Sequence, residues 1–289
     1  MKRERFDFVY GLGSGCSCWR ILRERGLQFA SFPLDWVGRP GWRGGEGLRK
    51  VAGLVVGGFA HWFEVANLER FPALDSPRHD AYLDRASGLC YVHDFDKGDD
   101  LHVRYPEIAA KYARRIARFH ARMAASRKVL LFWIADPRDA GEIAADDVRF
   151  AQEAFARRYP GVTFRFIVAS CAPGLPPGRA RVVRGDGFEL HAFDYRVATE
   201  GDPTWEVRTE MFAPVFDRFA CVDYRTRAEK RANAKRERAR EYEKFKAKSW
   251  WELVASRLQY KIYCHFRRRL DRKGVLKGLE RDANAAPRA

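Results

Sequence analysis

The sequence predicts an α/β protein with a three-layer domain, in which helices flank a mostly parallel β-sheet, followed by a basic C-terminal helical extension. Short apolar runs alternate along the chain with segments of about 10–20 residues that have helical spacing, the pattern of a parallel sheet with crossover helices. The composition then changes, because residues 224–248 contain almost no apolar side chains. We therefore predict an α/β domain over 1–224 and a helical extension over 225–289, whose end we expect to be disordered.

The first half of the domain contains three expected strands and two expected helices. The apolar run FDFVY predicts a strand at 6–10, and the spacing of apolar residues that follows predicts a helix over 17–25. The run QFASF predicts a second strand at 28–32. A helix over 46–56 and a strand at 89–92 (LCYV) complete this half.

The second half repeats the same alternation with longer elements. Apolar residues at spacings of three and four predict an amphipathic helix over 106–125. The run KVLLFWI predicts a buried strand at 128–134, a helix is expected over 143–158, and VTFRFIVAS predicts a strand at 162–170. The remaining expected elements are strands at 180–183 and 188–193 and a closing helix over 205–219.

The net charge of +16 is concentrated in the extension. Residues 225–289 hold 21 Lys and Arg against 8 Asp and Glu, so they carry +13 and leave +3 for the domain. A domain that binds nucleic acid over its whole surface is therefore not expected. The sequence contains no run of about 18 apolar residues, so no membrane-spanning helix is expected. The N-terminus lacks the apolar segment of a signal peptide. We expect a cytoplasmic protein.

The extension contains one amphipathic segment, residues 249–270. Its apolar residues stand four apart and Lys and Arg occupy the other positions, which is typical of a helix that lies on an anionic membrane surface. We predict that Trp250–Lys273 contacts such a surface, peripherally at the inner face of the membrane. A helix docked on the domain with a solvated basic face fits the same pattern. Nucleic acid is a less favoured partner, because the basic run has few aromatic residues and no recognised motif.

The six cysteines match neither a disulfide framework nor a zinc site. Cys16 and Cys18 are too close in sequence for an ordinary bridge, and the other four are scattered. A zinc site needs two C-x2-C-like pairs, or one with paired histidines. We therefore predict reduced cysteines, no metal and no cofactor.

The most informative motif is the glycine-rich turn GLGSGC at residues 11–16, between the first strand and the first helix. A dinucleotide fingerprint would need a third glycine at position 16, where Cys16 stands. A phosphate-binding P-loop is excluded, because no G-K-[ST] follows. A dinucleotide site is therefore a less favoured interpretation, and two others remain. The turn either serves only the backbone, through glycines that allow positive φ, or carries a nucleophile.

The nucleophile hypothesis rests on the position of Cys16 at the start of a helix. The helix dipole and the unpaired N–H groups there favour the thiolate and lower the pKa of a cysteine. The same N–H groups can stabilise an oxyanion, and Gly13, Ser14 and Gly15 let a substrate approach the backbone. Cys18 lies inside the helix, so Cys16 is the better candidate.

Several polar residues follow the predicted strands and would meet at the carboxyl edge of a parallel sheet. Cys16 follows the first strand and Asp35 and Trp36 follow the second. His93 and Asp94 follow the third, and ADPRD, with Arg138, follows the fourth. Each also has an ordinary interpretation, such as a turn-stabilising aspartate or a loop histidine.

The order GLGSGC, PLDW and HDF resembles a bacterial family of papain-like cysteine peptidases, long described as a domain of unknown function. The resemblance covers about residues 6–170. It implies Cys16 as nucleophile, His93 as general base, and Asp35 or Asp94 as acidic partner. The sequence departs from the family pattern at Gly11, where the family has Ser, at Trp133, and in its basic extension. The α/β alternation also differs from the two lobes of papain.

Three functions are consistent with these residues. The first is a cysteine-dependent hydrolase of acyl or peptide-like substrates, with Gly13, Ser14, Gly15, Trp36 and Arg138 binding the substrate. The second is a cysteine-dependent acyltransferase in cell-surface polysaccharide biosynthesis, since both chemistries use a thiolate, a histidine and an oxyanion hole. The third is a non-catalytic module that binds a glycan or nucleotide in the same crevice.

Overall fold

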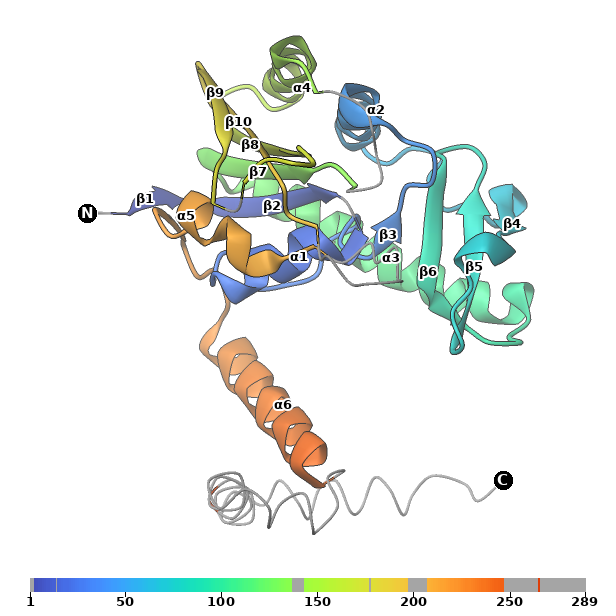
Figure 1. Ribbon diagram of the computed structural model, residues 1–289. Coiled ribbons are helices and arrows are strands. Elements are labelled where there is room, and N and C mark those ends of the chain that lie inside the picture. The colour runs from blue at the N-terminus through green and yellow to red at the C-terminus, as the bar shows by residue number, and fades with distance from the viewer. Residues whose placement is uncertain are drawn as a thin grey trace. The chain divides into compact units, whose positions relative to one another are not determined.

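The computed structural model describes residues 3–13, 15–136, 143–176, 178–196, 207–246 and 265. The chain divides into two compact units, Met1–Asp223 and Tyr224–Ala289. The first unit confirms the predicted α/β class, because it contains a mostly parallel sheet between helices (Figure 1).

The central sheet has five strands in the order β2-β7-β8-β10-β9. The first four are parallel, and β9 is antiparallel to β10. Strands that are buried on both faces need apolar residues at every position, which is why runs such as KVLLFWI predicted them. The strands are β2 (Phe8–Gly13), β7 (Lys128–Ile134), β8 (Thr163–Cys171), β10 (Phe188–Phe193) and β9 (Arg181–Gly185).

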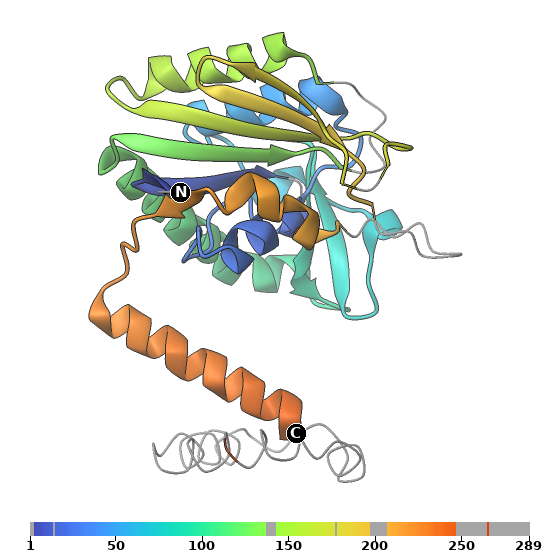
Figure 2. The same cartoon turned by 60° about the vertical axis from the view of Figure 1, so that its left-hand side comes forward.

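One face of this sheet is covered by α1 (Gly15–Glu24), the 3-10 turn Thr209–Phe212 and α5 (Ala213–Phe216). In Figure 2 the blue α1 and the orange α5 lie below the sheet, and the yellow-green α4 lies above it. The prediction of a closing helix over 205–219 is wrong, because the described part of this segment forms only these two short turns. The core on this face includes Val9, Ile21, Leu22, Leu130, Phe132, Ile134, Ile167, Phe212 and Phe216.

The other face packs against α2 (Gly44–Val56), α3 (Leu101–Ala124) and α4 (Ala145–Arg158). All three helices were expected from their spacing, with ends shifted by up to five residues. Phe119 of α3 lies on the rings of Phe8 and Tyr10 of β2, at 6.2 and 4.8 Å between ring centroids. These contacts fix α3 beside β2.

A second, antiparallel sheet has the order β3-β6-β5-β4. The sequence predicted only one of its strands, and placed that strand at 89–92 in the parallel sheet; this was wrong. The strand instead extends to Asp96 and pairs with β3 and β5. The four strands are β3 (Val37–Gly38), β6 (Leu89–Asp96), β5 (His79–Asp84) and β4 (Leu68–Arg70).

The strand expected at 28–32 is also wrong, because this segment forms no strand. Its polar groups bond within the loop: the Gln28 side chain donates to the carbonyl of Ala30 at 3.1 Å and to Asp35 at 2.8 Å. The apolar residue that suggested a strand, Phe32, packs its ring against Phe8 at 5.0 Å. The loop therefore contributes a ring to the core without pairing to a sheet.

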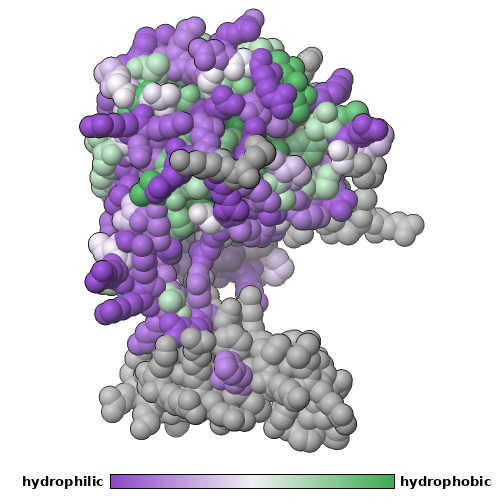
Figure 3. All heavy atoms as spheres, turned by 90° about the vertical axis from the view of Figure 1, so that its left-hand side faces the viewer, coloured by the Kyte–Doolittle hydropathy of each residue, from purple (hydrophilic) through white to green (hydrophobic). Residues whose placement is uncertain are grey.

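The chain ends of the first unit form a third, small sheet. Strand β1 (Glu4–Phe6) pairs in parallel with β11 (Phe219–Cys221). On the face in Figure 3, hydrophilic side chains predominate and apolar ones appear in scattered groups.

The described part of the second unit is α6 (Arg227–Lys246), which the sequence predicted as a charged helix or linker. Thr226 caps its first turn, because its Oγ1 accepts from the backbone N–H of Glu229 at 3.1 Å and the Glu229 carboxylate accepts from the N–H of Thr226 at 2.7 Å. Such a capping box satisfies two helix-end donors. Trp250–Lys273 lies outside the described residues except for His265. No helix in the described part of the chain is long and apolar enough to cross a membrane.

Candidate functional site

Cys16 lies in the first turn of α1, directly after the carboxyl end of β2. It is partly exposed and is not disulfide-bonded. Gly13 and Gly15 before it have φ values of 143° and 53°, in the region that side chains with a β-carbon rarely adopt. Ser14 lies outside the described residues. The turn thus places a thiol at the positive end of a ten-residue helix, where an anion is favoured.

The second cysteine of the motif, Cys18, has a structural position. Its side chain is buried, and its thiol donates to the carbonyl oxygens of Gly13 and Phe132. Burial raises the pKa of Cys18 to about 12, so the thiol keeps its proton. A β-carbon on Gly11 would lie 2.9 Å from that of Cys18, so glycine at position 11 lets α1 approach β2. The structure therefore leaves Cys16 as the accessible thiol of this turn.

Arg39, which no pattern in the sequence singled out, contacts the glycine turn. Its guanidinium donates to the carbonyls of Leu12 at 3.0 Å and Val37 at 3.2 Å. It lies over the Cα of Gly13, so that a β-carbon there would overlap it. Burial lowers the pKa of Arg39 to about 10, which still leaves it charged at neutral pH. A positive charge thus lies beside the glycine turn.

His93 lies in the middle of β6, where the strand bulges. Tyr82 of β5 pairs with Tyr91, and Asp80 pairs with Phe95, so one residue of β5 faces three residues of β6. Tyr91 and Phe95 are both fully buried. In a regular strand His93 would share their buried face, but it is exposed. The bulge therefore turns the imidazole out of the core, as bulges near active sites often do.

Neighbouring rings connect His93 to the helix that carries Cys16. Trp36 directly precedes β3 and meets the His93 ring edge-to-face, with 6.2 Å between centroids. The other side of this contact is Trp19, whose ring lies 4.5 Å from that of Trp36. Trp19 is three residues after Cys16, about one turn along α1. Two tryptophans in contact with each other, tilted at 47°, thus lie between the histidine and the helix of the cysteine.

The surroundings of His93 keep its imidazole neutral over a wider pH range. Desolvation by the neighbouring rings lowers its pKa, and the nearby His79 lowers it further, while Asp94 acts in the opposite direction. Although the side chain reaches solvent, its environment is thus partly apolar. A neutral imidazole is the form that can accept a proton.

Asp94, which the sequence also placed in the site, points to the opposite side of β6. Its carboxylate pairs with Lys111 and accepts from the Tyr112 hydroxyl at 2.6 Å, both on α3. These contacts attach α3 to β6. The structure shows no hydrogen bond between Asp94 and the His93 ring among the contacts it describes, and a role for Asp94 in catalysis stays a prediction.

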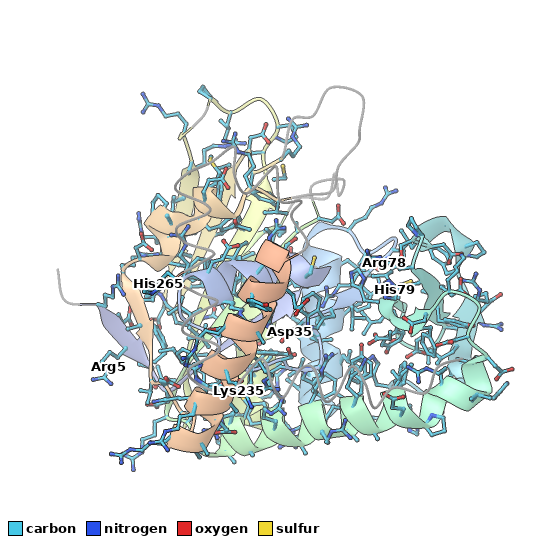
Figure 4. The ribbon with its side chains drawn as sticks, turned by 90° about the horizontal axis from the view of Figure 1, so that it is seen from below. Arg5, Asp35, Arg78, His79, Lys235 and His265 are labelled. Carbon is cyan, nitrogen blue, oxygen red and sulfur yellow. The ribbon has the colours of Figure 1, made fainter. Side chains whose placement is uncertain are left out.

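Asp35 is buried in the loop before β3, with only 1% of its surface exposed. One carboxyl oxygen accepts from the Gln28 side chain and from the N–H of Phe32, at 2.8 and 2.6 Å. The other oxygen has no hydrogen-bond partner among the described residues. Burial raises the pKa of Asp35 to about 7. Figure 4 labels this residue, which lies deep in the first unit.

The remaining predicted residues fall outside the described structure or lie apart. Arg138 belongs to residues 137–142, which are not described. We expected four polar clusters to lie together at one edge of the parallel sheet. This prediction is wrong for His93 and Asp35, because neither residue follows a strand of that sheet. Within the described ranges, no group of three or more His, Cys, Asp or Glu side chains is placed to hold a metal ion.

These observations define an α/β protein with an accessible cysteine at a helix N-terminus and a histidine turned out of the core nearby. Residues 7–174 match the family described as "Putative papain-like cysteine peptidase (DUF1796)". The match spans more than half of the chain, from β2 into the loop after β8, and the protein belongs to this family. No curated protein and no solved structure matches the chain.

Proposed function

We propose that the protein is a cysteine-dependent hydrolase of acyl or peptide-like substrates, with Cys16 as nucleophile and His93 as general base. The observation that carries this proposal is the bulge in β6. Because of this bulge, the His93 side chain does not pack in the core. Its imidazole instead contacts Trp36, which in turn contacts Trp19 on the helix of Cys16. Membership of a family of cysteine peptidases supports the same chemistry.

The reaction begins with proton transfer from the Cys16 thiol to His93. The thiolate attacks the substrate carbonyl carbon, and the N–H groups of the first turn of α1 stabilise the oxyanion that forms. The leaving group takes the proton from His93 and departs, which leaves a thioester on Cys16. His93 then accepts a proton from water, whose hydroxide attacks the thioester. The carbon–sulfur bond breaks, the acid product leaves, and His93 returns its proton to the Cys16 sulfur.

Acyl transfer differs from hydrolysis only in the second step. If a sugar hydroxyl replaces water as the acceptor, the same thioester gives an acylated sugar. The partly exposed rings of Trp19 and Trp36 can bind the apolar part of either kind of substrate. Product analysis with a thioester or amide substrate, with and without added sugar acceptors, distinguishes the two reactions.

The first test measures how fast iodoacetamide labels each cysteine as a function of pH, by mass spectrometry. We expect Cys16 to react selectively well below pH 8, because its thiolate is stabilised. In His93→Ala this low-pH reactivity should decrease. His102→Ala, at an exposed position on α3, is the matched control and should behave as the wild type.

Equal labelling of Cys16 and the other accessible thiols, unaffected by His93→Ala, would contradict the proposal. The protein would then be better explained as a binding module. In that case glycans and nucleotides would be tested as ligands by isothermal titration calorimetry.

We also propose that the basic extension binds anionic lipid at the inner face of the membrane. Support comes from the amphipathic pattern of 249–270 and from the nine Lys and Arg against four Asp and Glu in α6. The full chain should sediment with vesicles that contain phosphatidylglycerol and not with pure phosphatidylcholine, and salt should release it. Replacing Arg267, Arg268 and Arg269 by Gln should weaken binding, and unchanged binding would contradict this proposal.

A further inference from the structure

A second histidine, His79, contacts the candidate base from the neighbouring strand. We propose that His79 is a positioning residue for His93, because its imidazole packs edge-to-face against the His93 ring and is itself held by Ser76 and Asp96. This inference rests on the proposed role of His93 as general base. The sequence did not distinguish His79 from the exposed histidines.

The two rings are nearly perpendicular, at 86°, and their centroids are 5.7 Å apart. On the other side of His93, Trp36 makes a contact of the same kind at 83° and 6.2 Å. His93 thus stands on the middle one of three strands, between an aromatic ring from each flank. Because the bulge has removed this side chain from the packed core, these two rings, from the part of the chain that the structure describes, restrict its orientation.

Each ring nitrogen of His79 has a polar neighbour. Ser76 Oγ lies 3.3 Å from Nδ1, and Asp96 Oδ1 lies 3.7 Å from Nε2. The Ser76 oxygen already accepts from the backbone N–H groups of Arg78 and His79, at 3.3 and 3.0 Å. The Ser76 hydroxyl thus contacts the ring at Nδ1, and Asp96 faces Nε2. Figure 4 labels Arg78 and His79 on the second sheet.

Among the described residues, the charged groups near His93 lie on two strands. His79 lies on β5, and Asp94 and Asp96 lie on the same strand as His93. Trp36, which touches it from the β3 side, carries no charge. Burial and His79 both lower the pKa of His93, while Asp94 raises it. Packing of His79 against His93 thus favours the neutral imidazole that a general base requires.

The experiment follows the Cε1–H signal of His93 by NMR as a function of pH in the full chain, with His93→Gln for assignment. His79→Phe keeps a ring at the contact but removes the two ring nitrogens and their contacts with Ser76 and Asp96. His79→Ala removes the ring as well. We expect the pKa of His93 to rise in both variants, and more in His79→Ala, which also admits water to the imidazole.

Ser76→Ala provides a variant that leaves both histidines in place. It removes the hydroxyl that holds Nδ1, so we expect weaker nuclear Overhauser contacts between His93 and Trp36. His102→Phe, at an exposed site on α3, is the control and should leave the His93 titration unchanged. Melting temperatures of all variants show whether a change is local, because loss of folding would move every histidine signal.

The outcomes separate this inference from the proposed function. If the His93 titration and its contacts with Trp36 are the same in the wild type and in all three variants, His79 does not position His93 and the inference is overturned. This result does not depend on Cys16. If the His93 titration responds to His79 while Cys16 labelling ignores His93, the contact between the two rings is confirmed and the proposed function fails.

Discussion

Replacement of Asp35 by Asn tests whether this buried carboxyl is neutral or charged in the folded protein. The carboxyl has no ion-pair partner among the described residues, and one oxygen accepts both of its hydrogen bonds. The amide oxygen of Asn can accept the same two bonds. Burial raises the pKa of Asp35 from 3.8 to about 7 in the folded state. Between these two pH values the carboxyl is therefore protonated in the folded protein and ionised in the unfolded chain.

The sign follows from proton linkage. Stability falls with pH wherever the folded state binds more protons than the unfolded state. Wild type therefore loses stability between about pH 4 and pH 7 through this group, and above pH 7 the loss is complete. At about 1.4 kcal/mol per pH unit, the difference between 3.8 and about 7 corresponds to about 4 kcal/mol. Asn has no proton to lose, so the variant avoids this loss.

The assay is urea unfolding followed by tryptophan fluorescence at pH 5 and pH 8. We expect Asp35→Asn to gain stability relative to the wild type between these values, by about 2.5 kcal/mol, because about 2 of the 3 pH units of the wild-type loss lie above pH 5. Asp146→Asn, at an exposed carboxylate on α4, controls for the substitution itself. A variant that is less stable than the wild type at pH 8 would refute the reasoning, since it would mean that the folded protein uses the charged carboxylate.

The same variant tests the catalytic prediction for Asp35. If it folds normally but loses the low-pH labelling of Cys16, Asp35 acts as the acidic partner of the site. Unchanged labelling would assign the residue to the loop that carries Trp36.

Three further substitutions test the packing around the site. Gly13→Ala should lower stability by about 3 kcal/mol or more, because the β-carbon displaces the Arg39 guanidinium and the residue has φ 143°; thermal unfolding measures it, and a loss below about 1 kcal/mol would contradict the close contact. Tyr112→Phe should cost about 1.5–3 kcal/mol in urea unfolding through its bond to the Asp94 carboxylate; an unchanged midpoint would contradict that bond. Phe132→Ala should cost about 3–5 kcal/mol by the same assay, because the ring is fully buried; a loss below about 1 kcal/mol would contradict its core position.

The parallel sheet could be predicted from the sequence because burial on both faces leaves a direct signal. Strand β7 coincides with its predicted range of 128–134, and β10 with 188–193. The position of Cys16 at the start of a helix could be predicted for the same local reason, since glycines precede it and helical spacing follows. Both features depend on residues that are close in the sequence.

The second sheet could not be predicted, because its pattern depends on contacts between distant residues. The inner strand β6 has buried residues at positions 89, 90, 91 and 95, which is not the alternation of a regular strand. The loop around Asp35 looked like a strand because Phe32 and its neighbours are apolar. Only the fold shows that Phe32 fills a gap between Phe8 and Tyr10.

The bulge explains why the three residues of the HDF element, 93–95, have different surroundings. In a regular strand His93 and Phe95 would share one face and Asp94 would take the other. Instead Asp94 lies with Tyr91 on the side of α3, where both contact Tyr112, and Phe95 is buried against Tyr82 at 4.5 Å. Two neighbours of His93 thus anchor the strand on the core side.

This anchoring explains how an exposed histidine can be held in place. Asp94 binds α3 through Lys111 and Tyr112, and Phe95 fills the core, so the backbone between them is fixed from one side. His93 itself lies on the outer side, where its ring contacts those of Trp36 and His79. A strand without the bulge would bury His93, and a loop without the anchors would let it rotate. The combination restricts the orientation of His93, as its proposed role of general base requires, in a way that neither a regular strand nor a free loop provides.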